Sequence, residues 1–410
     1  MTYKKEEKIM RNVVVTGLGA VTAIGENVPK YWENLIAGKC GIRNITRIST
    51  DEHDTKVAAE VDDDFEASVK KHLKKRQLNP TTRTIRMGLA SAFEAIEDSG
   101  IDPKTYNGER VSVIYGIIDS SFRDAEAENK MHLTLKEMPS LLPAMLEIKY
   151  GFRGASFNLS TACASSAYAI ALGKMFIESG ASDMVVVGGV GQNVSHSALK
   201  GFNQIMAMSA NPDPITACRP FTKNRDGFIM GEGAGTIILE SEESALKRNS
   251  KIYCRLLGAS MCGEASDLTA PAANGEGMIY SIRLAMENAG IKAEDVDYIN
   301  AHGTSTNLND KYETMAIKSY FGERAYDIPV SSVKASIGHT LAAGGVLEAI
   351  SVIKAIETGV IPPTIHYDEP DPELDLDYVP NTARNKEINI ALSNSFGFGG
   401  HNSTLIFGKY

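Results

Sequence analysis

The stretch Ala162-Cys-Ala-Ser-Ser-Ala-Tyr-Ala-Ile-Ala-Leu-Gly-Lys-Met-Phe-Ile-Glu-Ser-Gly180 decides the fold. It is apolar nearly all round, rich in alanine and serine, and closed by glycine, which is typical of a helix buried on every side. The strand-like run Met184-Val-Val-Val187 follows it. A helix of this kind needs cover on all faces, so we expect layers of structure on both sides of it.

A second apolar helix followed by a strand-like run occurs later in the chain. Residues 338–359 form another apolar, glycine-closed helix, followed by the strand-like Ile388-Asn-Ile-Ala-Leu392. Each half also has an amphipathic, glycine-closed helix and a strand-like run, at residues 88–101 with 111–115 and at residues 280–291 with 296–300. Two similar halves of alternating helices and strands predict an α/β protein with a duplicated five-layer αβαβα architecture.

Composition narrows the class of protein. The 410 residues carry a net charge of −9, which disfavours general nucleic-acid binding. No apolar run reaches the roughly 18 residues that indicate a membrane span. The mixed charges at residues 1–8 lack the basic-then-apolar pattern of a signal peptide. We therefore expect a cytoplasmic protein that binds neither nucleic acid nor membrane.

The cysteines point to the same compartment. They are scattered and contain no Cys-x-x-Cys pair: Cys40, Cys163, Cys218, Cys254 and Cys262. This pattern predicts neither a disulfide framework nor a zinc site, and it suits a reducing cytoplasm.

A basic cluster at residues 70–76 departs from the acidic average. Its members are Lys70, Lys71, His72, Lys74, Lys75 and Arg76. The cluster is either a solvated helix face or a docking patch for an acidic partner, and the sequence leaves both interpretations open.

Cys163 stands where a strand-like segment turns into the first buried helix. The unpaired N–H groups and the dipole of a helix N-terminus stabilise a thiolate, and the same N–H groups can hold an oxyanion. Cys163 is therefore a candidate nucleophile for acyl-thioester chemistry. The alternative is a small buried core residue, which is the usual fate of a free cysteine.

Two histidines occupy significant places in the second half. His302 follows a strand in Asn300-Ala-His-Gly-Thr-Ser-Thr306, and ligands bind beyond the carboxyl ends of strands in open α/β sheets. His339 lies at the start of the helix that corresponds to the Cys163 helix. Equivalent helix starts face each other in a duplicated fold, so we expect Cys163 and His339 to converge on one pocket. For His302 a structural role remains the alternative.

The loop Asn394-Ser-Phe-Gly-Phe-Gly-Gly-His401 follows the last long strand. Its glycines let a backbone approach a ligand closely and point an N–H at it. We interpret the loop as the second half of an oxyanion hole, because two phenylalanines between glycines would need burial and suit a flexible turn poorly.

Together these motifs resemble the β-ketoacyl-acyl-carrier-protein synthases of the elongating Cys-His-His type, which are synthase II-like. The matching motifs are Thr161-Ala-Cys-Ala-Ser-Ser166, His302-Gly-Thr-Ser-Thr306, Lys334-Ala-Ser-Ile-Gly-His339 and Asn394-Ser-Phe-Gly-Phe-Gly-Gly400. Further matches are Val13-Val-Val-Thr-Gly-Leu-Gly19, Arg219-Pro-Phe221 and Arg225-Asp-Gly-Phe-Ile-Met-Gly-Glu-Gly-Ala234. The likeness implies the family's thiolase-type fold, with residues 1–250 carrying the nucleophile and residues 251–410 the two histidines.

The resemblance also implies an acyltransferase that elongates fatty acyl chains by decarboxylative Claisen condensation with a malonyl carrier. Cys163 would hold the acyl chain as a thioester, and the N–H groups of Cys163 and Phe398 would form the oxyanion hole. His302 and His339 would donate hydrogen bonds to the malonyl thioester carbonyl as CO2 leaves.

The family's remaining site residues carry over one by one. Lys334 and Glu348 would form a charged pair near the second histidine and orient it. Thr304 and Thr306 would bind the phosphopantetheine arm. Phe398 and Gly399 would also bind the substrate, and Phe398 would gate the acyl pocket.

The resemblance implies no cofactor of the protein's own, because the substrates arrive on the phosphopantetheine of an acyl carrier protein. The carrier protein is therefore one implied partner. The other is a second subunit, which is either an identical chain or a homologous chain-length factor.

Four other kinds of protein fit the sequence less well. Thiolases need a cysteine near the C-terminus, and Cys262 is the last one here. Initiating synthases have asparagine in the place of His339, and non-catalytic chain-length factors lack the cysteine. A dehydrogenase is disfavoured because Thr22 stands where the motif begun by Gly17-Leu-Gly19 needs its third glycine.

Departures from the family pattern leave two biosynthetic pathways as alternatives. Gly116-Ile-Ile-Asp-Ser-Ser121 replaces a glycine-rich turn of housekeeping enzymes, and the segment from there to Cys163 is shorter. Met206 stands where many relatives have a basic residue, and Asn307 where proline is common. The alternative to fatty-acid elongation is the ketosynthase subunit of a type II polyketide or polyene synthase.

Overall fold

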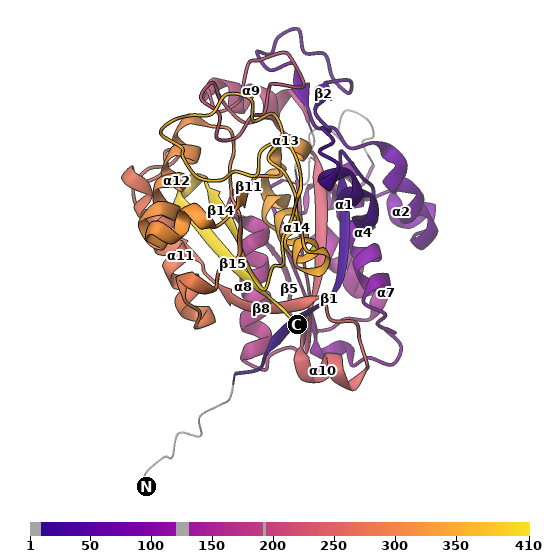
Figure 1. Ribbon diagram of the computed structural model, residues 1–410. Helices are drawn as coiled ribbons and strands as arrows, with labels where there is room; N and C mark the ends of the chain where they lie inside the picture. Colours follow the sequence, from indigo (N-terminus) through magenta and orange to yellow (C-terminus); the bar gives the residue numbers. More distant parts are fainter. Residues whose placement is uncertain (1–9, 120–130, 192–193) are drawn as a thin grey trace.

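The computed structural model describes residues 10–119, 131–191 and 194–410 (Figure 1). The charged run at residues 1–8, and with it the argument about a signal peptide, lies outside the described residues. So do the last two residues of the departing stretch 116–121. Within the described residues, no helix has both the length and the apolar character needed to span a membrane.

Among the described residues the main sheet has eleven strands. Five strands from each half have the same arrangement, and the short β9 (Cys262–Gly263) pairs with the last strand of the second set. The first set is β1 (Val13–Thr22), β4 (Val111–Ile117), β5 (Ser156–Leu159), β6 (Met184–Val190) and β7 (Gly233–Ser241). The second is β8 (Cys254–Ala259), β10 (Tyr298–Asn300), β11 (Val330–Ser331), β14 (Ile390–Gly397) and β15 (His401–Lys409). Their orders are β5-β4-β6-β7-β1 and β11-β10-β14-β15-β8, which is 3-2-4-5-1 in both when each set is numbered along the chain.

The strand directions also repeat. The first three strands of each order are parallel, and the last two pair antiparallel. We expected a separate sheet on each side of the central helices. Instead the halves are continuous, because β1 and β8 pair at Val14↔Arg255 and Val15↔Cys254. The duplication is confirmed, whereas the domain division at residue 250 stays a prediction.

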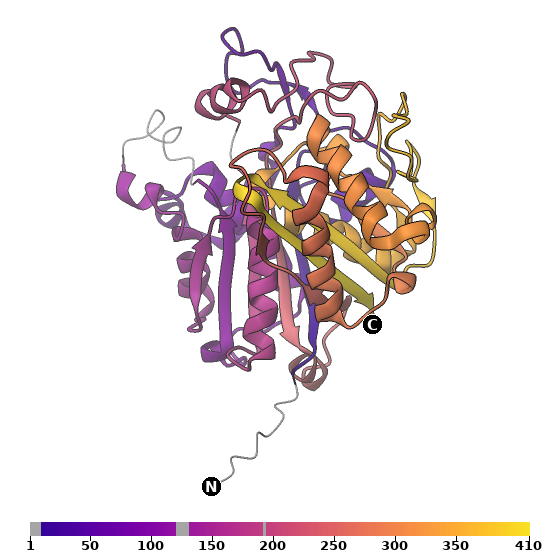
Figure 2. The same ribbon diagram turned by 90° about the vertical axis from the view of Figure 1, so that its left-hand side faces the viewer.

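The two sets of strands form two of the five layers, and helices form the other three. At the centre, α8 (Ser165–Glu178) packs against α14 (Gly344–Thr358). The outer face of the first half is covered by α4 (Arg83–Asp98) and α7 (Leu141–Tyr150). The outer face of the second half is covered by α11 (Glu276–Ala289), with α12 (Asn307–Phe321) beside it. Figures 1 and 2 show α8 between these outer groups, which confirms the five-layer prediction.

The remaining elements are short and lie around this frame. They are α1 (Val28–Ile36), α2 (Glu66–His72), α3 (Lys75–Leu78), α6 (Leu133–Glu137), α9 (His196–Gln204), α10 (Glu242–Lys247), α13 (Lys334–Ile337), β2 (Arg43–Asn44), β3 (Val57–Ala58), β12 (Val360–Ile361) and β13 (Arg384–Asn385).

Small residues permit the close packing of the layers. A Cβ on Gly345 of α14 would lie 2.9 Å from the Ala167 nitrogen of α8. A Cβ on Gly19 would lie 1.9 Å from the Ser91 oxygen of α4. Gly19 therefore admits a helix backbone against β1, and this packing accounts for the glycine without dinucleotide binding.

The second central helix begins later than we predicted. The chain forms α13, passes through Gly338 at φ +68°, and makes a 3-10 turn at Leu341–Ala343 before α14 begins. His339 therefore precedes this turn and is not at the helix start, whereas Cys163 lies two residues before α8. The helix predicted at residues 88–101 starts earlier, because the Thr82 side chain caps α4 by accepting from the Ile85 N–H.

Candidate active site

One cavity of about 310 Å³ receives side chains from both halves of the fold. Cys163 lines it from the first half, and His302, His339 and Phe398 line it from the second. The two imidazole rings are nearly perpendicular, with centroids 5.3 Å apart. The three residues that we singled out as reactive therefore share one space.

A strained turn presents Cys163 to this cavity. Ala162 has φ +48°, a left-handed conformation that costs a non-glycine residue roughly 1 to 3 kcal/mol. Ser165 holds the turn, since its hydroxyl accepts from the Thr161 N–H at 2.9 Å and donates to the Ala162 carbonyl at 2.6 Å. The surrounding structure maintains this strain at the turn from which Cys163 lines the cavity.

The thiol is protonated at neutral pH. Burial raises the pKa of Cys163 to about 11, although Lys334 and the backbone N–H groups of Phe398 and Cys163 act to lower it. We had expected the helix N-terminus to stabilise the thiolate. Burial outweighs that effect, because removing the thiol from water disfavours its charged form.

The glycine-rich loop lies against the nucleophile. A Cβ on Gly397 would lie 3.2 Å from the Cys163 nitrogen and 3.0 Å from the Thr161 oxygen, so any other residue would require these backbone atoms to shift. The next N–H, from Phe398, acts on the thiol together with that of Cys163. Two backbone donors thus converge at one point, as an oxyanion hole requires.

Gly399 differs from our prediction. It does not line the cavity, and its N–H is donated to the Leu268 carbonyl at 2.7 Å. Its φ of +79° instead makes it part of the turn that holds Phe398 in place.

Both histidines present an Nε2–H to the cavity. Lys334 Nζ lies 3.3 Å from His302 Nδ1, and the Leu341 N–H lies 3.3 Å from His339 Nδ1. An ammonium and a backbone amide can only donate, so each Nδ1 accepts and each proton is on Nε2. Burial lowers the pKa of both rings well below the usual value, with Lys334 adding to the effect. The histidines are therefore neutral donors.

Lys334 and Glu348 form a buried ion pair, as the family pattern implied. Their side chains are only 1% and 2% exposed. Our expectation that the pair orients the second histidine was wrong, since Lys334 Nζ donates to the carbonyl of His302 and faces its Nδ1. The pair therefore sets the tautomer of the first histidine.

Glu313 is a site residue that the sequence analysis missed. It is fully buried on α12, and its carboxylate accepts the N–H groups of His302 and Gly303, each at 2.8 Å. Burial raises its pKa to about 7, against the lowering effect of these N–H groups. Asp310, one turn earlier, accepts the Ser305 N–H in the same way. Two acids three residues apart on a helix that follows the His302 motif were the available signal.

The mouth of the cavity is apolar with a small polar patch. Thr304 and Thr306 line it, and their hydroxyls are hydrogen bonded to each other at 2.8 Å. Exposed Ile205, Met206 and Leu308 also line it, and Met206 is 86% exposed. Thr304 and Thr306 therefore lie next to an apolar rim, and their role in binding the phosphopantetheine arm stays a prediction.

The basic cluster lies elsewhere. Residues 70–76 belong to α2, α3 and the turn between them, and none lines the cavity. Lys71 and His72 both approach Glu97, at 2.9 and 3.2 Å, whereas Lys70, Lys74, Lys75 and Arg76 are exposed. The docking interpretation stays a prediction. Among the described residues, no group of three or more His, Cys, Asp or Glu side chains is arranged to hold a metal ion.

Comparisons with known proteins identify the family. Family models for the β-ketoacyl synthase N-terminal domain and C-terminal domain match residues 10–245 and 253–368. The chain is 39% identical to 3-oxoacyl-[acyl-carrier-protein] synthase 2 of Staphylococcus aureus (strain COL), covering 98% of this chain and 99% of that protein.

The fold also matches that of solved structures over nearly the whole chain. The ishigamide ketosynthase/chain length factor has a TM-score of 0.90 at 34% identity, covering 98% of this chain and 100% of that one. A type II polyketide ketosynthase, bound to the hexaketide and in complex with its acyl-carrier protein, has a TM-score of 0.89 at 30% identity, with the same coverage.

Proposed function

Because the chain belongs to the β-ketoacyl synthase family, we propose that it elongates fatty acyl chains on an acyl carrier protein, using Cys163, His302 and His339. It is a condensing acyltransferase. One observation carries the assignment of residues: a buried cysteine beside two backbone donors shares a cavity with two neutral Nε2–H donors.

The first step is acyl loading. Cys163 sulfur attacks the carbonyl carbon of an acyl-carrier thioester, and the N–H groups of Cys163 and Phe398 hold the resulting oxyanion. Collapse of this intermediate forms the acyl-Cys163 thioester and expels the pantetheine sulfur, which takes up the proton lost by the Cys163 thiol. The histidines are not needed for this exchange.

The second step is decarboxylation of a malonyl thioester. Its carbonyl oxygen accepts hydrogen bonds from Nε2 of His302 and His339, the bond to the carboxylate breaks, and the electron pair of that bond forms the enolate. Neutral donors with little competing water stabilise the developing charge better than water would. The enolate carbon then attacks the acyl-Cys163 carbonyl, and Cys163 leaves as the thiolate.

The substrates carry their own prosthetic arm. In this proposal phosphopantetheine enters past Thr304 and Thr306, and the reaction calls for no cofactor of the protein's own. The carrier would meet the apolar rim of Ile205, Met206 and Leu308, with residues 70–76 as a second candidate contact.

We also propose that the chain works as a dimer through the edge of the first half. β5 ends the sheet and, among the described strands, pairs only with β4. Near this edge α7 exposes Ile148 and α8 exposes Met175. An open edge next to exposed apolar side chains favours a second subunit there.

An intact-mass experiment tests the function. The purified chain should gain one acyl group from an acyl carrier and then, with malonyl carrier, release CO2 and β-ketoacyl carrier. A chain that forms no acyl adduct and releases no CO2 would contradict it.

The polyketide function remains the second candidate, favoured by the likeness to a ketosynthase/chain length factor and to a type II polyketide ketosynthase. The two candidates differ in what the chain needs. A chain that elongates ordinary fatty acyl carriers alone supports the first candidate. A requirement for a homologous subunit without the cysteine supports the second.

A further inference from the structure

Glu232 belongs to a matched family motif, yet no step of the reaction uses it. The motif ends in Met230-Gly-Glu-Gly-Ala234, and the Glu232 carboxylate is fully buried. We infer that Glu232 is a positioning residue, which holds His339 in the geometry that decarboxylation requires. This inference rests on the proposed function and deepens it.

His339 is tied to the segment that precedes Glu232. Its N–H donates to the Ile229 carbonyl at 2.7 Å, and its own carbonyl accepts from the Gly231 N–H at 2.9 Å. A Cβ on Gly231 would lie 2.2 Å from the Ile337 oxygen, so the two backbones touch. The His339 backbone therefore cannot move independently of residues 229–231.

Glu232 fixes the other side of the same segment. Its carboxylate accepts the N–H of Val61 at 2.9 Å and that of Val194 at 3.1 Å. The segment also pairs with Ala59, which donates to the Met230 carbonyl and accepts from the Glu232 N–H, both at 2.9 Å. A displacement of Glu232 would thus move the segment 229–231, to which His339 is hydrogen bonded.

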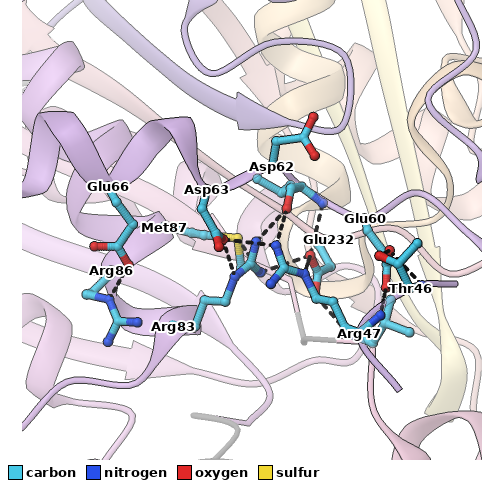
Figure 3. Close-up of polar contacts among 12 residues, drawn as sticks. Thr46, Arg47, Glu60, Asp62, Asp63, Glu66, Arg83, Arg86, Met87 and Glu232 are labelled. Atoms are coloured by element: carbon cyan, nitrogen blue, oxygen red, sulfur yellow. Dashed lines mark hydrogen bonds and ion pairs between the residues drawn. The ribbon is translucent and has the colours of Figure 1, made fainter. Parts of the chain in front are cut away.

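Two arginines balance the buried charge, as Figure 3 shows. Arg83 Nη1 lies 2.9 Å and Arg47 Nε 4.0 Å from Glu232 Oε2. Asp63 accepts from the same two arginines, at 3.2 Å from Arg83 and 2.9 Å from Arg47. Since α4 supplies Arg83, the group ties the segment bonded to His339 to the outer layer of the fold. Removing its buried charge leaves the cations unbalanced and loosens the group.

β7 itself supplies a matched control. Glu240, near the far end of this strand, is also a fully buried carboxylate, and it lies 2.8 Å from Arg248 Nη2. Its other partners, which include Thr16 and Ser244, do not line the cavity. Glu240 lies near the end of β7, and Glu232 directly precedes its start, so Glu232→Gln and Glu240→Gln remove the same charge at opposite ends of β7.

The test compares two partial reactions of the full-length protein. Acyl loading of Cys163 is followed by intact mass, CO2 release by radiolabelled malonyl carrier, and folding by thermal unfolding. Displacing a positioned group costs on the order of tenfold to hundredfold in rate, so Glu232→Gln should slow CO2 release by that factor relative to loading. Glu240→Gln should leave the ratio unchanged, even where it lowers the melting temperature equally.

Arg83→Gln approaches the same group from α4 and should reproduce the altered ratio if Glu232→Gln does not fold. An unchanged ratio in both variants, or equal losses of both reactions, would overturn the inference. A wild-type chain that neither loads nor releases CO2 would instead overturn the proposed function, and this is visible before any variant is made.

Discussion

The cysteine side and the histidine side of the cavity face each other across a duplicated fold, yet they differ physically. Cys163 lies on a strained turn, and burial raises the pKa of its thiol to about 11. Hydrogen bonds to Nδ1 hold the rings of His302 and His339. Burial keeps both rings neutral. In the proposed reaction Cys163 must form and break a covalent bond to the acyl chain, whereas the two histidines must only donate hydrogen bonds. The difference indicates that loading and decarboxylation can be separated by mutation.

The largest effect is expected when the nucleophile on the cysteine side is removed. Cys163→Ala should abolish acyl loading completely and leave malonyl decarboxylation in place, because the histidine donors are intact. Intact mass spectrometry and CO2 release measure the two reactions. Cys254→Ala, which removes a buried thiol from β8, is the control and should load normally. An acyl adduct on the Cys163→Ala protein would refute the assignment of the nucleophile.

The histidine variants should give the opposite result. His302→Ala and His339→Ala each remove one Nε2–H donor, which costs about 10² to 10³ in rate at comparable sites. We expect CO2 release to fall by that factor while loading continues. His53→Ala, whose ring pairs with His196 outside the cavity, is the control. Normal CO2 release from either cavity variant would show that its ring is not a donor.

Lys334→Met tests whether the histidine side depends on its buried support. His302 loses the donor that fixes its tautomer, so CO2 release should fall about tenfold or more, as for a misplaced hydrogen bond. Glu348 is left as an unpaired buried acid, so the free energy of unfolding should fall by about 3 to 5 kcal/mol. Lys334→Met with Glu348→Gln should recover stability without recovering CO2 release. Unchanged CO2 release in Lys334→Met would break the link between the ion pair and His302.

The pH dependence distinguishes the two sides of the cavity without any substitution. Loading should rise about tenfold per pH unit between pH 7 and 9, because the thiolate fraction grows below a pKa of about 11. CO2 release should stay flat over the same range, since the lowered pKa values keep both histidines neutral above their usual value. Initial rates of each reaction across this range provide the check. A fall in CO2 release between pH 7 and 9, or pH-independent loading, would contradict the description of the two sides.

Sequence patterns predicted the frame and the reactive residues, because both depend on local features. Glycine-closed apolar helices gave the duplication, and motif order gave Cys163, His302 and His339. Contacts distant in sequence were not predictable in the same way. Lys334 supports His302 and not His339 because α13 brings its ammonium group to the His302 carbonyl.

Electrostatic properties were the least predictable. A helix N-terminus favours a thiolate, but the amount of water excluded around Cys163 decides its pKa, and no local pattern gives that amount. Glu313 was missed for a related reason. It is an acid in an ordinary-looking position that is buried only once distant segments have packed against it. Glu232 lies in a quoted motif, but the motif alone did not show which groups its carboxylate contacts.

The most direct test is the double variant His302→Ala/His339→Ala, incubated with acyl carrier and then with radiolabelled malonyl carrier. We predict an acyl adduct on Cys163 at the wild-type stoichiometry and no CO2 release above background. Failure to form the adduct would show that the histidines take part in loading, and CO2 release at the wild-type rate would show that they are not the decarboxylation donors. Either result would contradict the division of the cavity into two independent sides.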